Sequence, residues 1–187
     1  MIPFKEFRTQ NKTQLFWLLF GLTVPTIVGI QITGSALVNE IAPMGVVTFE
    51  LVGTLSGSQS IVESWQGAAM TWAGINMGLD FLFLLLYSMT IALACLILAG
   101  RMPGNLQGLK ILGGWLALGI LIAAGLDAIE NIALILLLAG SENEFLSPLA
   151  RWMAIPKFGL VLLSLLYVGG AGVRELMNRT RLSSNTA

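Results

Sequence analysis

Four long apolar segments restrict this 187-residue chain to very few folds. They cover about residues 15–38, 78–99, 111–139 and 149–172, and a helix needs roughly 20 apolar residues to cross a bilayer core. Charged residues make up 11% of the chain, against roughly 25% in soluble domains. Within lipid, backbone polar groups must be satisfied inside the segment, which favours helices. The sequence therefore predicts an all-α integral membrane protein, a four-helix up-down transmembrane bundle in one domain spanning residues 1–172.

The first apolar segment has two interpretations. Lys5, Arg8 and Lys12 precede it, as in a signal peptide or in a first membrane anchor. The apolar run is longer than the roughly 7 to 15 residues of a signal-peptide core, so we expect an anchor. The small residues at 34–36 leave cleavage as the alternative.

Residues 39–76 are apolar in patches but interrupted by glycine and proline, and they predict an extracytoplasmic cap of short helices. Ser60 to Glu63 match a capping box, and Trp65 and Trp72 follow at helical spacing. We therefore expect one cap helix to begin at Ser60, with both tryptophans at the membrane interface. A second short helix is expected over residues 43–53.

The distribution of lysine and arginine predicts the orientation. Three lie before the first segment, two in the link at 100–110 and three after residue 172, whereas the cap and residues 140–148 contain none. The positive-inside rule then places both termini in the cytoplasm and the cap outside a cell (inner or plasma) membrane. Residues 173–187 are expected to form a disordered cytoplasmic tail.

Three polar residues interrupt the third apolar segment. Asp127, Glu130 and Asn131 have the spacing i, i+3 and i+4, so on a helix they share one face. An ionisable residue at the centre of a bilayer costs roughly 2.5 to 3.5 kcal/mol even on insertion scales, so such residues face a protein interior or a wet cavity. We expect the other segments to cover this patch.

Counting residues from the middle of each segment places Lys157 and Gln31 at the depth of this patch, with Asp80 and Arg151 nearer the outer surface. A two-tier polar network is therefore predicted in the outer half of the bundle, and Tyr87 extends the face of Asp80 inward. Arg151 and Lys157 lie about 120° apart on a regular helix, so both can join only if Pro156 bends the chain. The candidate ligand- or ion-binding residues are Asp127, Glu130, Asn131, Lys157, Asp80, Gln31, Arg151 and, from the cap, Glu50, whose side chain could face solvent or the bundle.

Composition excludes several kinds of site. The chain has no histidine and one cysteine, Cys95, which argues against histidine-ligated metals and an intrachain disulfide. No metal site is predicted, and no cofactor can be identified. The net charge of zero gives no reason to expect nucleic acid. Small residues such as Gly113 and Ala117 favour close helix packing, within the chain or in a homo-oligomer.

Four functions fit these features. The preferred one is an accessory or small-ligand role, with a lipid or small apolar molecule bound in an outward-facing pocket. The first alternative is cation- or proton-coupled transport, because carboxylates and an amide supply hard oxygen ligands. The second is a membrane-embedded enzyme that uses Asp127 and Glu130 as acid and base on a lipid substrate, but no nucleophile motif accompanies them. Finally, an ion-pair network can fix helix register with no ligand at all.

Overall fold

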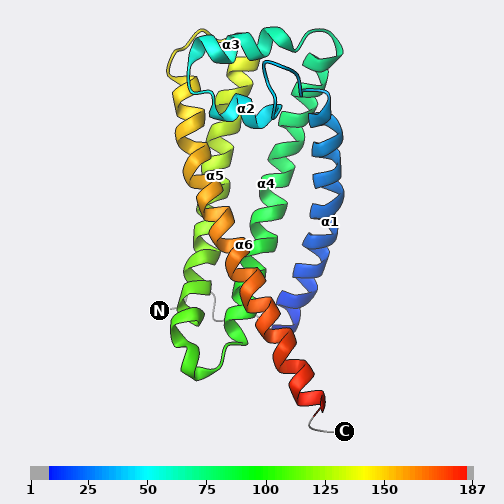
Figure 1. Cartoon of the computed structure of the whole chain (residues 1–187), viewed down its shortest axis with the longest axis vertical. Coiled ribbons are helices and arrows are strands. Elements are labelled where there is room, and N and C mark those ends of the chain that lie inside the picture. The colour runs from blue at the N-terminus through cyan, green and yellow to red at the C-terminus, as the bar shows by residue number, and fades with distance from the viewer. Residues whose placement is uncertain (1–8, 185–187) are drawn as a thin grey trace.

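Four long helices form the body of the protein in the computed structural model, which describes residues 9–184. They are α1 (Thr9–Ser35), α4 (Ala68–Gly100), α5 (Gln107–Leu138) and α6 (Leu146–Ser184). Successive long helices run in opposite directions, and the described chain starts and ends at the same end of the bundle (Figure 1). All four are long and apolar enough to cross a membrane. The prediction of a helical chain with four such segments is confirmed.

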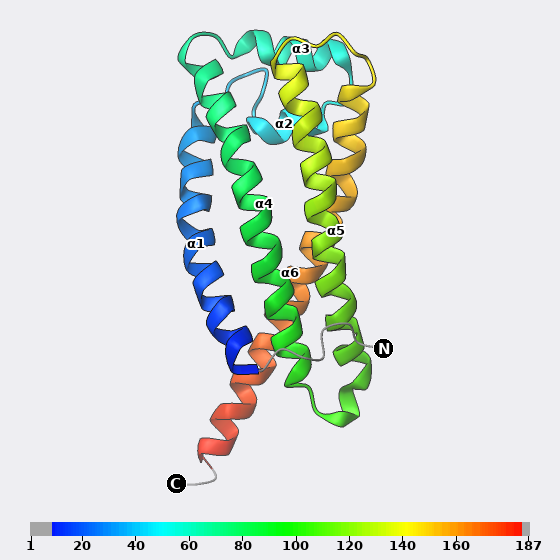
Figure 2. The same ribbon diagram turned by 180° about the vertical axis from the view of Figure 1, so that it is seen from behind.

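Each long helix packs mainly against the long helix next to it in the sequence. α4 packs against both α1 and α5, and α6 packs against α5 and crosses the bundle obliquely (Figures 1 and 2). Polar contacts join α1 to α4: the Thr23 and Thr90 hydroxyls lie 3.1 Å apart, and the Asn76 amide donates to the Ile30 carbonyl and to Thr33 Oγ1. Consequently α1 joins the bundle chiefly by packing against α4, and the face of α1 that makes this contact carries Thr23 and Thr33.

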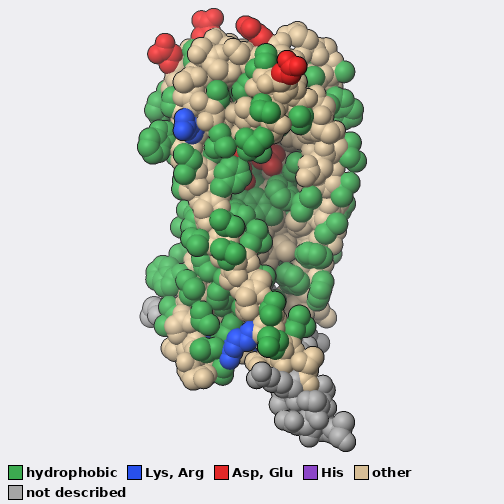
Figure 3. All heavy atoms as spheres, in the orientation of Figure 1, with side chains coloured by type: hydrophobic (Ala, Val, Ile, Leu, Met, Phe, Trp, Pro, Cys, Tyr) green, Lys and Arg blue, Asp and Glu red, His purple; other side chains and the backbone are tan. Residues whose placement is uncertain are grey.

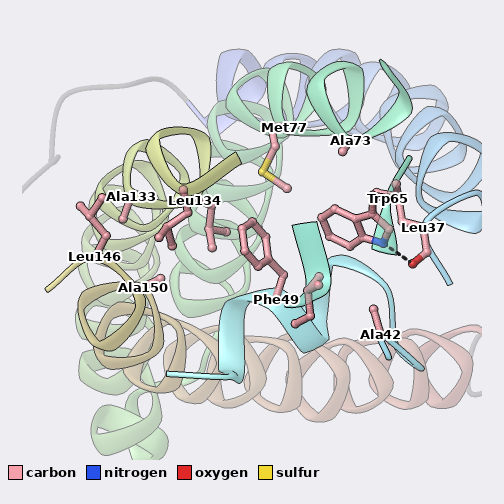
Figure 4. Packing of buried hydrophobic residues seen from close by; sticks show 12 residues of the cluster. Leu37, Ala42, Phe49, Trp65, Ala73, Met77, Ala133, Leu134, Leu146 and Ala150 are labelled. Carbon is pink, nitrogen blue, oxygen red and sulfur yellow. Dashed lines mark hydrogen bonds between the residues drawn. The ribbon is translucent and has the colours of Figure 1, made fainter. Parts of the chain in front are cut away.

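A cap of two short helices, α2 (Val46–Leu51) and α3 (Leu55–Ser64), closes one end of the bundle (Figure 1). Trp65 is completely buried beneath it. Its indole nitrogen donates to the Leu37 carbonyl over 2.9 Å, and its ring meets Phe49 edge-on at 5.3 Å between centroids (Figure 4). Leu134 of α5 belongs to the same cluster, which therefore ties the cap to the long helices.

The start of the second long helix differs from the expected position. α4 begins at Ala68, whereas the glycines at 74 and 78 had suggested a start at residue 78. A Cβ added at Gly74 or Gly78 would meet no atom within 4 Å, so both lie on an open helix surface. Glycine costs about 1 kcal/mol relative to alanine inside a helix, and the many buried apolar side chains of α4 offset this cost. The first helix is already present at Thr9, where the described residues begin, and the fourth helix begins at Leu146, a few residues earlier than expected.

The capping-box prediction is wrong. α3 begins at Leu55, and its N-cap is Thr54, whose hydroxyl accepts from the Gly57 amide. Ser60 lies in mid-helix and donates to the Ser56 carbonyl instead. Trp65 is also buried rather than interfacial, while Trp72 on α4 is 40% exposed. The expected second short helix is present as α2.

α6 continues to Ser184, although a disordered tail was expected from residue 173. Contacts with the link between α4 and α5 accompany this extension: Arg101 pairs with Glu175 at 3.8 Å, and Arg174 donates to the Met102 sulfur at 3.1 Å. Neither Pro156 nor the glycines at 169–172 end the helix. Residues 185–187 of the expected tail, and Lys5 and Arg8 of the N-terminal basic group, lie outside the described residues.

The half of the bundle away from the cap has its own core, and it holds a close helix contact. Its buried residues include Leu84, Cys95, Ile120 and Ala123. Gly113 of α5 lies against α4 and α6: a Cβ there would come within 2.8 Å of Ala99 Cβ and 2.7 Å of Tyr167 Cζ. Only glycine fits this approach without a shift of the helices.

We therefore expect Gly113→Ala to destabilise the protein, by about 1–3 kcal/mol as in other overpacked cores. The Ala99 side chain cannot rotate away, so α4 and α5 would have to separate. Thermal unfolding in detergent measures the effect. Gly114→Ala is the matched control, because a Cβ at Gly114 meets no atom within 4 Å and alanine is the better helix former. Equal melting temperatures for the two variants would contradict the tight contact.

Candidate functional site

Lys157 of α6 is the centre of a buried ion-pair network in the half of the bundle nearer the cap. Its Nζ lies 2.7 Å from Glu130 Oε2 and 3.0 Å from Asp127 Oδ1, both on α5. Glu50 Oε2 of α2 is 3.8 Å away, within ion-pair range but too long for a hydrogen bond. The Lys157 side chain is 7% exposed and that of Glu130 is fully buried. One ammonium thus joins a cap helix to two of the long helices.

Hydrogen bonds extend the network to α4. The Tyr87 hydroxyl donates to Asp127 Oδ2 over 2.9 Å, so both oxygens of Asp127 have a partner. The Asn131 amide donates to Asp80 Oδ2. The three polar residues of α5 are all buried: Asp127 and Glu130 contact Lys157 of α6, and Asp127 and Asn131 contact residues of α4.

Glu50 and Glu130 are both incompletely hydrogen-bonded, and Glu50 is the one of the two that lines the cavity described below. Glu50 is 7% exposed, and its Oε2 accepts no hydrogen bond from the described residues. Burial raises the pKa of Glu50 to about 8; the Lys157 ammonium opposes this rise, and the carboxylates Glu130, Asp80 and Asp127 add to it. At neutral pH this carboxyl group is therefore mainly protonated. Its side chain faces the bundle, not the solvent, which settles the choice that the sequence left open.

Gln31 and Arg151 do not join the network. Gln31 is exposed on α1, because it is two positions before Thr33, which faces α4, and two positions correspond to about 200° around a helix. Arg151 is exposed on α6 and covers Gly53, where a Cβ would lie 2.6 Å from Arg151 Cδ. Arg151 and Lys157 therefore differ as their spacing predicts, one exposed and the other buried, and Asp80 accepts from Asn131 instead of pairing with Arg151.

A cavity of about 380 Å³ opens beside the network, which we call the lateral cavity. Its polar lining comprises Glu50, Asp80, Tyr87, Asp127 and Lys157, together with Thr23 and Thr90. Its apolar walls include Phe20 and Ile27 of α1, Phe83 and Ile91 of α4, and Phe158 and Val161 of α6. Figure 3 shows a hollow on this face, with acidic side chains at its base and apolar side chains around its mouth.

The apolar wall is the part of the site that sequence reasoning missed. Its three phenylalanines come from three helices, and each is one apolar residue among many in its segment. The Phe83 and Tyr87 rings are 4.9 Å apart, and the Lys157 ammonium lies 4.8 Å from the Phe158 ring centroid. Only the four-residue spacing of Phe83 and Tyr87 could have indicated that aromatic rings gather here.

The chemistry of the site follows from its charges. Four carboxyl groups, those of Glu50, Asp80, Asp127 and Glu130, share one ammonium. Isolated carboxylates are too costly in a low-dielectric interior, so the excess acids must hold protons or a cationic group. Within residues 9–184, no group of three or more acidic or cysteine side chains is arranged to hold a metal ion.

Comparisons of the chain with protein-family models, with curated protein sequences and with solved structures gave no match.

Proposed function

We propose that this is a membrane protein that binds a lipid-like amphiphile in the lateral cavity, with the polar head at the Lys157 network and the apolar body against the bilayer. The observation that carries the proposal is the pairing of a buried polar cluster with an apolar hollow that opens on the side of the bundle. A ligand pocket typically combines a mostly apolar lining with a few fixed polar groups, at about this volume.

The outer surface of the long helices supports insertion into a membrane. Large apolar side chains are exposed on all four, such as Leu18, Leu85, Ile122 and Leu166 at 53–64%. The cap carries acidic but no basic side chains, so by the positive-inside rule we place it outside and both termini in the cytoplasm of a cell membrane. A hollow between α1 and α6 would then open to the outer leaflet.

Transport is the weaker candidate. A transported ion needs a polar route to the other face, and the half of the bundle away from the cap holds a core of residues such as Leu116, Ala117 and Ile120. An enzyme would use the same carboxyl groups on the bound amphiphile. Both alternatives require the cavity to be occupied first, so ligand binding is the function to test.

The test uses protein in lipid nanodiscs and long-chain probes that carry a photoreactive diazirine in the chain and a hydroxyl, carboxylate or trimethylammonium head. We expect at least one probe to label peptides of α1, α4 or α6 that line the cavity. Val161→Trp fills the cavity and should lower this labelling about tenfold or more.

Leu162→Trp is the matched control, because Leu162 is 58% exposed and does not line the cavity. It should label like the wild type. If no probe gives labelling that Val161→Trp reduces more than Leu162→Trp does, the proposed function is wrong.

A further inference from the structure

We infer that the molecule bound in the lateral cavity carries a cationic ammonium head, which lies against the Glu50 carboxylate and the aromatic rings of the cavity wall. This inference rests on the proposed function and names the class of ligand. The expected ligand is therefore an apolar chain that carries a quaternary or protonated amine.

The acids that line the cavity favour a cation. Glu50, Asp80 and Asp127 line it together with one base, Lys157, and Lys157 is already paired with Glu130, which does not line the cavity. Asp127 has a donor on each oxygen, and Asp80 accepts from Asn131. Among the described residues Glu50 Oε2 has no hydrogen-bond donor, and its one charged neighbour within 4 Å is the Lys157 ammonium at 3.8 Å, although Glu50 is more than nine-tenths buried. Glu50 is thus the carboxyl group available to a guest.

The aromatic rings favour the same ligand independently of the acids. Phe20, Phe83, Tyr87 and Phe158 line the cavity from α1, α4 and α6. The electron-rich faces of such rings attract ammonium groups, and cages of this kind bind quaternary amines. One ammonium, that of Lys157, already lies 4.8 Å from the Phe158 ring centroid. A carboxylate or phosphate head would instead face several carboxyl groups.

Binding of the cation should depend on pH. The groups that face Glu50 are Lys157 of α6, Glu130 and Asp127 of α5, and Asp80 of α4. Since burial raises the pKa of Glu50 to about 8, a cation that needs the ionised carboxylate must displace a proton below that pH. Affinity should therefore fall as pH decreases through 8, by up to about tenfold per unit for one displaced proton.

The experiment compares three diazirine probes of equal chain length in nanodiscs, with trimethylammonium, hydroxyl and carboxylate heads. The trimethylammonium charge does not titrate. At pH 8.5 we expect the ammonium probe to label the cavity at a concentration at least tenfold lower than the other two. Its half-saturating concentration should rise about tenfold or more on going to pH 6.5. Glu50→Gln should weaken the ammonium probe and remove most of this pH dependence.

The outcomes separate the two proposals. If the hydroxyl or carboxylate probe labels as well as the ammonium probe, the cavity binds amphiphiles but the inference is wrong. If ammonium labelling is independent of pH in the wild-type protein, the role of Glu50 is overturned, whether or not the variant folds. If no probe labels the cavity, both proposals fail.

Discussion

Lys157→Met is expected to be among the most destabilising single substitutions in this chain. Methionine nearly matches the length of lysine but removes the ammonium that Glu130 and Asp127 contact at 2.7 and 3.0 Å. Removal of one partner from a buried ion pair costs about 3–5 kcal/mol, because the remaining charge is left uncompensated. We expect a large fall in the melting temperature in detergent and reduced yield of folded protein.

Two further variants isolate the electrostatic cause of this loss. Arg151→Met removes a basic residue from the same helix at an exposed position outside the network, and it should change stability by less than about 1 kcal/mol. Adding Glu130→Gln and Asp127→Asn to Lys157→Met removes the orphaned carboxylates and should recover part of the lost stability. If the triple variant is no more stable than Lys157→Met alone, the loss reflects packing and the ion-pair interpretation is wrong.

Trp65→Ala is the second substitution with a large expected effect. Trp65 is fully buried, contacts the Phe49 ring and donates to the Leu37 carbonyl. Truncation of a buried tryptophan to alanine costs about 3–5 kcal/mol, and here it also leaves the Leu37 carbonyl without its donor. Because this cluster holds the cap on the long helices, we expect the cap to be lost first. Limited proteolysis between residues 39 and 67 should accelerate in parallel with a lower melting temperature.

Trp72→Ala is the control for this prediction. Trp72 is 40% exposed at the start of α4, so its truncation should cost much less and leave the cap resistant to protease. Comparable effects of the two substitutions would show that the cap is not held by the Trp65 cluster.

The cap shows where local sequence patterns fail. Residues Ser60 to Glu63 satisfy the capping-box pattern fully, yet α3 begins at Leu55 with Thr54 as its cap. Short motifs of serine and glutamate occur by chance, and tertiary burial decides which candidate is used. For α3 the decisive contacts include the Ser58 hydroxyl, which lies 2.7 Å from that of Ser147 on α6.

Position along the long axis of the bundle could be counted from the sequence, but rotation about each helix axis could not. Lys157 and Gln31 were both placed at the level of Asp127, and only Lys157 meets it, because Gln31 points about 200° away from the side of α1 that packs on α4. Arg151 likewise stays outside the network, because it lies on a different side of α6 from Lys157. In a helix that is apolar on every side, the hydrophobic pattern does not indicate which face is buried.

The number of long helices and the shared face of Asp127, Glu130 and Asn131 could be predicted from the amino-acid sequence, because segment length and the 3.6-residue period are local properties of the chain. The tertiary structure alone decided that Glu50 folds back from the cap to Lys157, and that Phe20, Phe83 and Phe158 meet around a cavity. Those contacts join segments tens of residues apart, and they depend on how obliquely α6 crosses the bundle and on how each helix is rotated. Both follow from packing between helices, which no single segment specifies.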